Sequence, residues 1–167
     1  AGCKTLANRS TPTIEPTVMA KTDIPSIEPG ITLAPPETGS PAKPVIIDTD
    51  MAADDWMAIL YLLQRTDISV KAITVSGTGE AHCQPGIKNA LGLVALAGDE
   101  KIPVSCGRET PLQGDHVFPD EWRTGVDGLY GLFLPKSETA ASNLPAVGLI
   151  SEAIRTSPVP ITLLTLG

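Results

Sequence analysis

Short apolar runs alternate with helical stretches from residue 45 onward, and this alternation limits the fold more than any other feature of the sequence. Each run is short and rich in β-branched residues, as in buried strands, and each helical stretch repeats apolar residues at a helical period. The expected strands are 45–47, 69–75, 102–106 and 161–166, and the expected helices are 54–64, 85–97 and 146–156. This order predicts an α/β fold with a mostly parallel, Rossmann-like sheet flanked by helices.

The pattern stops before its last unit is complete. The fourth expected strand runs almost to Gly167, and no covering helix follows it in the sequence. We therefore expect residues 44–167 to be the N-terminal portion of a longer domain, incomplete at the C-terminus. In open parallel sheets ligands bind at the carboxyl ends of the strands, so the loops 48–55 and 76–84 are where a site is expected.

Residues 1–43 have a different composition. The stretch 4–44 holds eight of the sixteen prolines, many Thr and Ser residues, and no regular apolar period. Such a segment cannot bury enough surface to offset its ordering entropy, so we expect a disordered Pro/Thr-rich tether. The first residues, Ala-Gly-Cys-Lys, resemble the end of a bacterial lipobox, with Cys3 as the lipidation site. The prediction is an extracytoplasmic, lipid-anchored protein; a secreted protein or a truncated leader is the alternative.

The charge and hydropathy of the sequence limit the classes of partner that the protein is expected to bind. A formal net charge of −7 argues against a nucleic-acid-binding surface, which needs clustered Lys and Arg. No stretch approaches the roughly 20 apolar residues of a membrane-spanning helix, so a lipid anchor is the expected route to a membrane. The sequence leaves a homo-oligomer open.

Two cysteines fall inside the folded part. Cys83 and Cys106 do not have the spacing of a metal-binding pair. A disulfide between them would need an oxidising compartment. Because Cys106 stands in an apolar strand-like run, where buried free thiols are common, two free cysteines are the favoured expectation.

Four carboxylates, Asp48, Asp50, Asp54 and Asp55, stand within eight residues between the first strand and the first helix. Any one of them has an ordinary explanation as a strand end or helix cap. Together they form converging anions that lose hydration, which is costly unless a cation or proton compensates. A hard divalent cation with oxygen ligands answers this need, and Ca²⁺ fits at least as well as Mg²⁺.

The segment VIIDTDMAADDWMAIL resembles the N-terminal signature of the inosine-uridine-preferring nucleoside hydrolase family, in which an apolar strand leads into DxDxxxDD and a helix. Weaker similarity continues through KAITVSGTGEAH, NALGLVALAG, IPVSCG, TGVDGLYGL and ITLLTLG. The resemblance covers about residues 44–167. It implies a hydrolase that cleaves the N-glycosidic bond of ribonucleosides to base and ribose through a calcium-activated water, as in purine and pyrimidine salvage.

The resemblance also implies roles for individual residues. Asp50 would be a metal ligand and the general base that activates the attacking water, and Asp55 would be the second carboxylate ligand. Asp54 would accept hydrogen bonds from ribose hydroxyls, and Asp48 would support Asp50 from behind. The main-chain carbonyl of Leu166 falls where the family uses a carbonyl ligand.

Two positions depart from the family pattern. Thr78 stands where many members have an Asn that contacts the ribose, and it remains a substrate-binding candidate. Thr124 stands where many members have a His before Gly. The resemblance therefore does not imply which nucleobase this protein prefers. The His and the further Asp ligand that the family places toward its C-terminus are absent here, and we expect the 167 residues alone to be inactive.

Other loop residues are weaker candidates. His82 and His116 could contact a substrate, and His116 stands in a loop with aromatic residues that could stack on a base or pack as a lid. Glu80 and Asp127 could add charge to the rim of a site. The alternative is that all four are solvated loop residues without a role in a site.

Two other functions compete with the nucleoside hydrolase interpretation. VIIDTD also resembles the nucleophile strand of a haloacid-dehalogenase-like, Mg²⁺-dependent phosphatase, with Asp48 as nucleophile and Asp50 as acid/base. That family has no need of the Asp54–Asp55 pair, and Ala52 departs from its usual Thr or Val. The non-enzymatic alternative is a tethered lipoprotein that binds nucleoside or ribose without catalysis.

Overall fold

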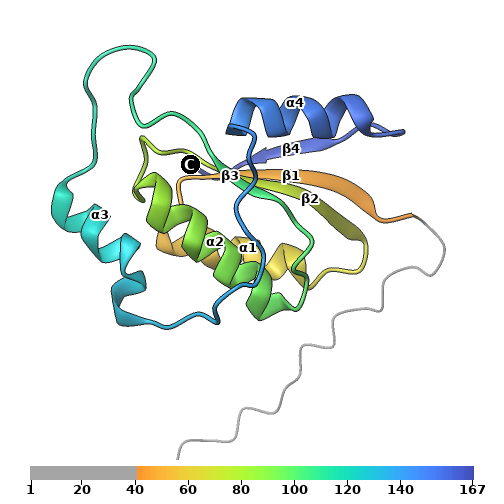
Figure 1. The fold of residues 1–167 in the computed structure, drawn as a ribbon, viewed down its shortest axis with the longest axis horizontal. Coiled ribbons are helices and arrows are strands. Elements are labelled where there is room, and N and C mark those ends of the chain that lie inside the picture. The colour runs from red at the N-terminus through yellow and green to blue at the C-terminus, as the bar shows by residue number, and fades with distance from the viewer. Residues whose placement is uncertain (1–40) are drawn as a thin grey trace, which may run out of the picture. The chain divides into compact units, whose positions relative to one another are not determined.

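The computed structural model describes residues 41–167. Cys3 and all but the last three residues of the predicted tether, 1–43, therefore lie outside the described residues. Four strands form one sheet in the order β3-β2-β1-β4, and every neighbouring pair is parallel. Their bounds are β1 Lys43–Thr49, β2 Ile68–Val75, β3 Val104–Cys106 and β4 Thr162–Thr165 (Figure 1). The predicted α/β fold with a parallel sheet is confirmed.

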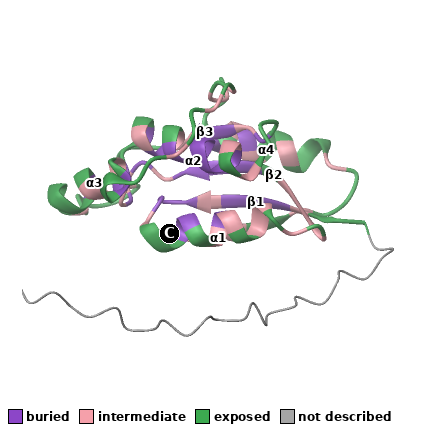
Figure 2. Cartoon of the chain, turned by 90° about the horizontal axis from the view of Figure 1, so that it is seen from below, coloured by how far each residue is buried: buried purple, intermediate pink, exposed green. Residues whose placement is uncertain are grey.

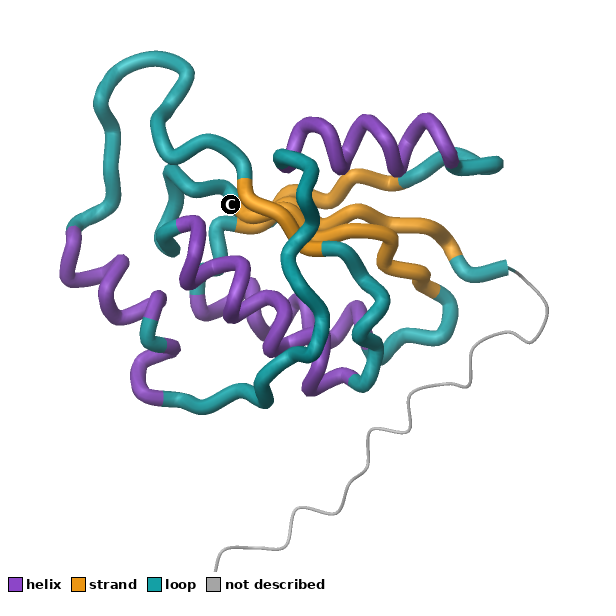
Figure 3. The backbone as a smooth tube through the Cα atoms, in the orientation of Figure 1, coloured by secondary structure: helices purple, strands orange, loops and turns teal. Residues whose placement is uncertain are grey.

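Helices cover both faces of this sheet. The helix α1 (Ala53–Leu63) and the helix α2 (Cys83–Ala97) lie on one face, and α4 (Ala146–Thr156) lies on the other (Figures 1 and 3). A short helix α3 (Asp120–Asp127) and a 3₁₀ turn η1 (Leu129–Gly131) follow in the long connection after β3. None of the helices in the described range is long and apolar enough to cross a membrane.

The central strand β1 is apolar on both sides because both sides are covered. Ile46 packs with Ala72 and Leu149 on the α4 side. Val45 and Ile47 join the larger core that α1 and α2 close on the opposite side. In Figure 2 the buried segments, in purple, lie along β1 and on part of the neighbouring α1. Such two-sided burial is typical of parallel strands and explains why β1 reads as a continuous apolar run.

The register brings the strand exits to one edge of the sheet. Thr49 pairs with Val75, and Val75 pairs with Cys106, while Asp48 pairs with Thr165. The segments that follow β1, β2, β3 and β4 therefore leave the sheet at the same edge. Residues distant in the sequence meet there, as expected for a site in a parallel sheet.

The prediction of two free cysteines is wrong. Cys83 opens α2 and Cys106 ends β3, and a disulfide joins them with their Cα atoms 5.6 Å apart. The error has a topological cause, because the start of α2 and the end of β3 lie at the same edge of a parallel sheet. That proximity leaves no mark in the local apolar pattern around Cys106.

Candidate functional site

The turn after β1 has an unusual backbone. Met51 is fully buried and has φ 64°, in the left-handed region that residues other than glycine rarely occupy. Its N–H donates to the Thr49 hydroxyl at 2.9 Å, and its carbonyl accepts the indole N–H of Trp56 at 2.7 Å. These bonds fix a sharp turn that leads directly into α1.

The turn buries two carboxylates. Asp50 is 8% exposed and Asp55 is 3% exposed. Burial raises the pKa of Asp55 to about 6; the hydrogen bond from Thr49 opposes this rise, and the charges of Asp50 and Asp54 add to it. The raised pKa reflects an environment that disfavours an uncompensated carboxylate.

Backbone N–H groups hold Asp50 in place. Its Oδ1 accepts from Ala52 and its Oδ2 accepts from Glu80, both at 3.2 Å. Its own carbonyl accepts from Ala81 at 3.0 Å. Gly79 lies so close that a Cβ added there would collide with the Asp50 side chain. The loop after β2 therefore lies directly against Asp50.

Asp48 and Leu166 meet on the neighbouring side of the site. The Thr74 hydroxyl of β2 donates to the carboxylate of Asp48. The Leu166 N–H donates to the Asp48 carbonyl at 2.9 Å, which carries the exit of β4 alongside that of β1. A Cβ built on Gly167 would stand 2.9 Å from the Asp50 Cβ, so this main chain reaches the carboxylate.

The two expected ribose contacts occupy more open positions. Asp54 is exposed in the first turn of α1. Thr78 is half-buried in the loop after β2, and its hydroxyl lies 3.1 Å from that of Ser76. Both therefore keep polar groups that a ligand could reach.

The donor set suits a hard cation, although it is incomplete in residues 41–167. Within that range no three His, Cys, Asp or Glu side chains gather closely enough to hold a metal by themselves. Asp50 and Asp55 are nevertheless buried with no Lys, Arg or His paired to either in the described part of the chain. Asp50 lies next to the Gly167 main chain, and Asp55 interacts with Asp50, so together they offer the oxygen ligands that Ca²⁺ and Mg²⁺ prefer.

Comparison with known proteins decides the family. A family model described as inosine-uridine preferring nucleoside hydrolase matches residues 45–167. The chain belongs to this family. The match includes the turn after β1 with all four aspartates, and it extends through β4.

Individual relatives agree with this assignment. A pyrimidine-specific ribonucleoside hydrolase, RihA, from Salmonella arizonae is 36% identical over 126 residues, which are 75% of this chain and 40% of that protein. A plant nucleoside hydrolase, PpNRh1, has a solved structure with 35% identity and a TM-score of 0.65, over 76% of this chain and 40% of that one. An inosine-guanosine nucleoside hydrolase gives 28% identity and a TM-score of 0.64, over 75% and 40%. The chain thus spans about 40% of the length of the relatives it matches.

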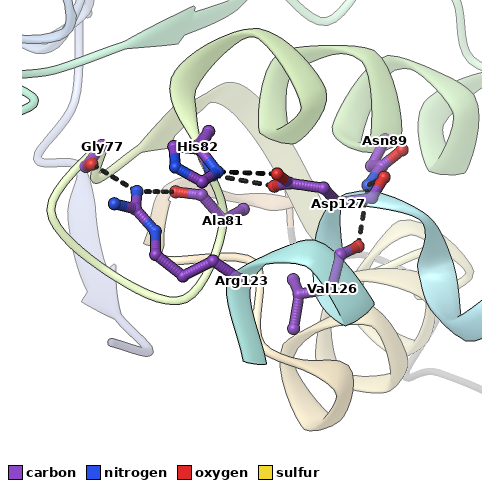
Figure 4. Close-up of polar contacts among 7 residues, drawn as sticks. All are labelled: Gly77, Ala81, His82, Asn89, Arg123, Val126 and Asp127. Carbon is purple, nitrogen blue, oxygen red and sulfur yellow. Dashed lines mark hydrogen bonds and ion pairs between the residues drawn. The ribbon is translucent and has the colours of Figure 1, made fainter. Parts of the chain in front are cut away.

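The structure also brings together residues that the sequence left apart. Arg123 is buried in α3 and donates to two carbonyls of the loop after β2. Asp127, also in α3, pairs with His82 at 2.6 Å between Oδ2 and Nδ1 (Figure 4). We did not predict α3, yet Pro119 followed by Asp120 and Glu121 is a typical helix start and would have located it.

A separate cavity lies elsewhere in the described residues. It has a volume of about 780 Å³ and lies between α2 and residues 127–141. None of the four aspartates of the DxDxxxDD motif lines it. The candidate site at the exit of β1 and this cavity are therefore lined by different residues.

Proposed function

We propose that the protein hydrolyses the N-glycosidic bond of ribonucleosides to a free base and ribose. One observation carries the proposal: the family's paired aspartates, Asp50 and Asp55, are buried together at the carboxyl end of β1 without a cationic side-chain partner in residues 41–167. The relatives are nucleoside hydrolases by name, which supports the same reaction here. This support favours N-glycosidic hydrolysis over the phosphatase interpretation.

Asp50 is the proposed general base. Its carboxylate oxygens accept N–H groups from Ala52 and Glu80, which fix its orientation and leave lone pairs for a proton from water. As Asp50 takes that proton, the water oxygen bonds to the anomeric carbon, and the electron pair of the glycosidic bond leaves with the base. Positive charge grows on the ribose ring during this step, and nearby carboxylates stabilise it.

Asp54 and Thr78 are proposed to hold the ribose. The exposed carboxylate of Asp54 can accept hydrogen bonds from two hydroxyls, and the Thr78 hydroxyl can donate one and accept another. Asp48 holds β1 in register through Thr74 and Leu166 and so supports Asp50 from behind. The departing base needs a proton, and we assign its donor to the part of the family domain that this chain does not span.

The proposed cofactor is Ca²⁺, with Mg²⁺ as the less favoured ion. Asp50, Asp55 and the main-chain carbonyl of Leu166 would hold it, since all three offer hard oxygen ligands. When bound, the cation would supply Lewis acidity that favours a water nucleophile at neutral pH. Because the chain spans about 40% of its relatives, we also propose that its 167 residues alone do not turn over nucleosides.

Export and anchoring through Cys3 remain part of the proposal. The Cys83–Cys106 disulfide supports export, because disulfides persist in oxidising compartments outside the cytosol. Metabolic labelling with a fatty acid, compared between the protein and a Cys3→Ser variant, tests the anchor. Loss of label in the variant is expected, and equal labelling of both would contradict it.

The function is tested by base release from a panel of nucleosides. The assay uses the 167-residue chain and the longest reading frame that contains it, each with Ca²⁺ or with a chelator. Hydrolysis by the longer protein, lost with chelator, is expected. Phosphomonoester turnover would contradict the proposal, and so would chelator-sensitive nucleoside binding without turnover, which describes a binding lipoprotein.

A further inference from the structure

The loop between β2 and α2, residues 76–82, lies between the buried carboxylate and α3. On its inner side the N–H groups of Glu80 and Ala81 donate to the side chain and carbonyl of Asp50. Gly79 packs against Asp50 too closely to admit a side chain. Thr78 belongs to the same loop, so a shift of the loop would move both the contacts to Asp50 and a proposed ribose contact.

On its outer side Arg123 holds this loop at two points. One guanidinium nitrogen, Nη2, donates to the Gly77 carbonyl at 2.9 Å and to the Ala81 carbonyl at 3.0 Å (Figure 4). The two carbonyls enclose residues 78–80. Because Arg123 is only 8% exposed, water cannot easily replace these bonds if the side chain is lost.

Asp127 holds the end of the same loop. Its Oδ1 accepts the main-chain N–H of His82 at 2.9 Å, and its Oδ2 lies 2.6 Å from the ring Nδ1 of His82 (Figure 4). Arg123 and Asp127 are four residues apart and so share one face of α3. The Asn89 side chain of α2 donates to the carbonyls of Val126 and Asp127, which fixes the last turn of α3.

We propose that Arg123 and Asp127 are positioning residues that set the affinity for the ribose of the substrate by holding the loop 76–82 against Asp50. We call this pair the α3 clamp. The proposal rests on the proposed nucleoside hydrolysis. The argument for this role is the position of the hydrogen-bond partners. Arg123 and Asp127 both bond to the loop that carries Thr78 and the N–H donors to Asp50, and within residues 41–167 neither side chain bonds to a strand of the core.

The first test measures amide hydrogen exchange in the 167-residue chain and needs no activity. Arg123→Met removes both donations and keeps an apolar stem, Arg123→Lys returns a charged donor, and Asp127→Ala removes the second contact. The control is Arg65→Met, because Arg65 pairs with Asp67 on the surface near the start of β2. We expect the Glu80 and Ala81 amides to exchange at least about tenfold faster in R123M and D127A, with partial recovery in R123K and no change in R65M.

Core amides of β1, such as that of Ile47, separate loop release from unfolding. If they lose protection together with the loop in both R123M and D127A, the two side chains hold the fold as a whole and the proposal is overturned. Unchanged exchange of Glu80 and Ala81 in both variants also overturns it. Release of the loop with a protected core supports it.

The second test measures nucleoside hydrolysis by the longest reading frame that contains the chain. R123M is expected to raise KM about tenfold and also to lower kcat, because the released loop carries both Thr78, which is proposed to hold the ribose, and the Glu80 N–H that orients Asp50. A purely structural role would lower the active fraction and leave KM unchanged, and that result would overturn the assignment. If the unchanged protein hydrolyses no nucleoside, the proposed function fails. The hydrogen-exchange experiment still tests whether the α3 clamp holds the loop 76–82.

Discussion

The Thr49 hydroxyl donates to the buried carboxylate of Asp55 across the turn between β1 and α1, with Oγ1 and Oδ2 2.5 Å apart. The same hydroxyl accepts the N–H of Met51, the residue with the left-handed backbone. A single threonine therefore supports both the unusual turn and one of the two buried carboxylates of the candidate site.

Replacing Thr49 with Val should destabilise the chain. The change keeps the shape of the side chain but leaves a buried carboxylate and a buried N–H without their partner, a loss of about 1–3 kcal/mol in the free energy of unfolding. Urea denaturation at neutral pH measures it. The control is Thr162→Val on the exposed surface of β4, which should stay within about 0.5 kcal/mol. Equal stability of the two variants would show that the Thr49 contacts contribute little.

The raised pKa of Asp55 predicts how stability depends on pH without a cation. Because the folded chain binds this proton more tightly than the unfolded chain, the contribution is complete below the ordinary pKa of 3.8 and is lost as the pH rises through about 6. Asp55→Asn has no such proton to lose. In the presence of chelator, we expect the Tm of Asp55→Asn minus the Tm of the unchanged chain to increase as the pH rises from about 4 to about 7.

Asp67 supplies a control of opposite sign. Its hydrogen bond from Arg65 lowers its pKa, so Asp67 contributes stability above its ordinary pKa and loses it on acidification. Asp67→Asn should therefore fall behind the unchanged chain as the pH rises to the ordinary pKa of 3.8, and the difference should stay nearly constant between about pH 4 and pH 7. Parallel Tm curves for Asp55→Asn and the unchanged chain would contradict the assignment for Asp55.

The Cys83–Cys106 disulfide should stabilise the chain measurably. It closes a segment with a sequence separation of 23 residues, for which the loss of unfolded-state entropy gives about 3 kcal/mol. Reduction with a thiol reagent should lower the urea midpoint of the unchanged chain, and a Cys83→Ser, Cys106→Ser double variant should not respond. An unchanged midpoint after complete reduction would contradict this prediction.

The sequence was sufficient to locate β1 and the DxDxxxDD motif. Val45, Ile46 and Ile47 are buried on both faces and therefore form a continuous apolar run, and the carboxylates follow at the strand exit. Helix bounds agreed within a few residues, since apolar periodicity reports the face that packs on the sheet. The strand expected at 102–106 was shorter than predicted, because only Val104–Cys106 pairs with β2.

Contacts between distant residues could not be read in the same way. Arg123 bonds to carbonyls 42 and 46 residues away, and main-chain acceptors have no residue type to recognise. The helix α3 is only eight residues long, and it buries the charged Arg123 while Trp122 is exposed, so its apolar residues do not mark the face that packs. The disulfide depended on which strand ends are neighbours, and strand order is a property of the whole sheet.

The central claim is that Asp50 acts as the base in cation-dependent hydrolysis of nucleosides. Its most direct test is kcat for base release by the longest reading frame containing the chain, compared with Asp50→Asn at saturating Ca²⁺. Loss of a general base predicts a fall in kcat of about 10²–10⁴-fold. A variant that keeps kcat within about tenfold of the unchanged protein would contradict the claim.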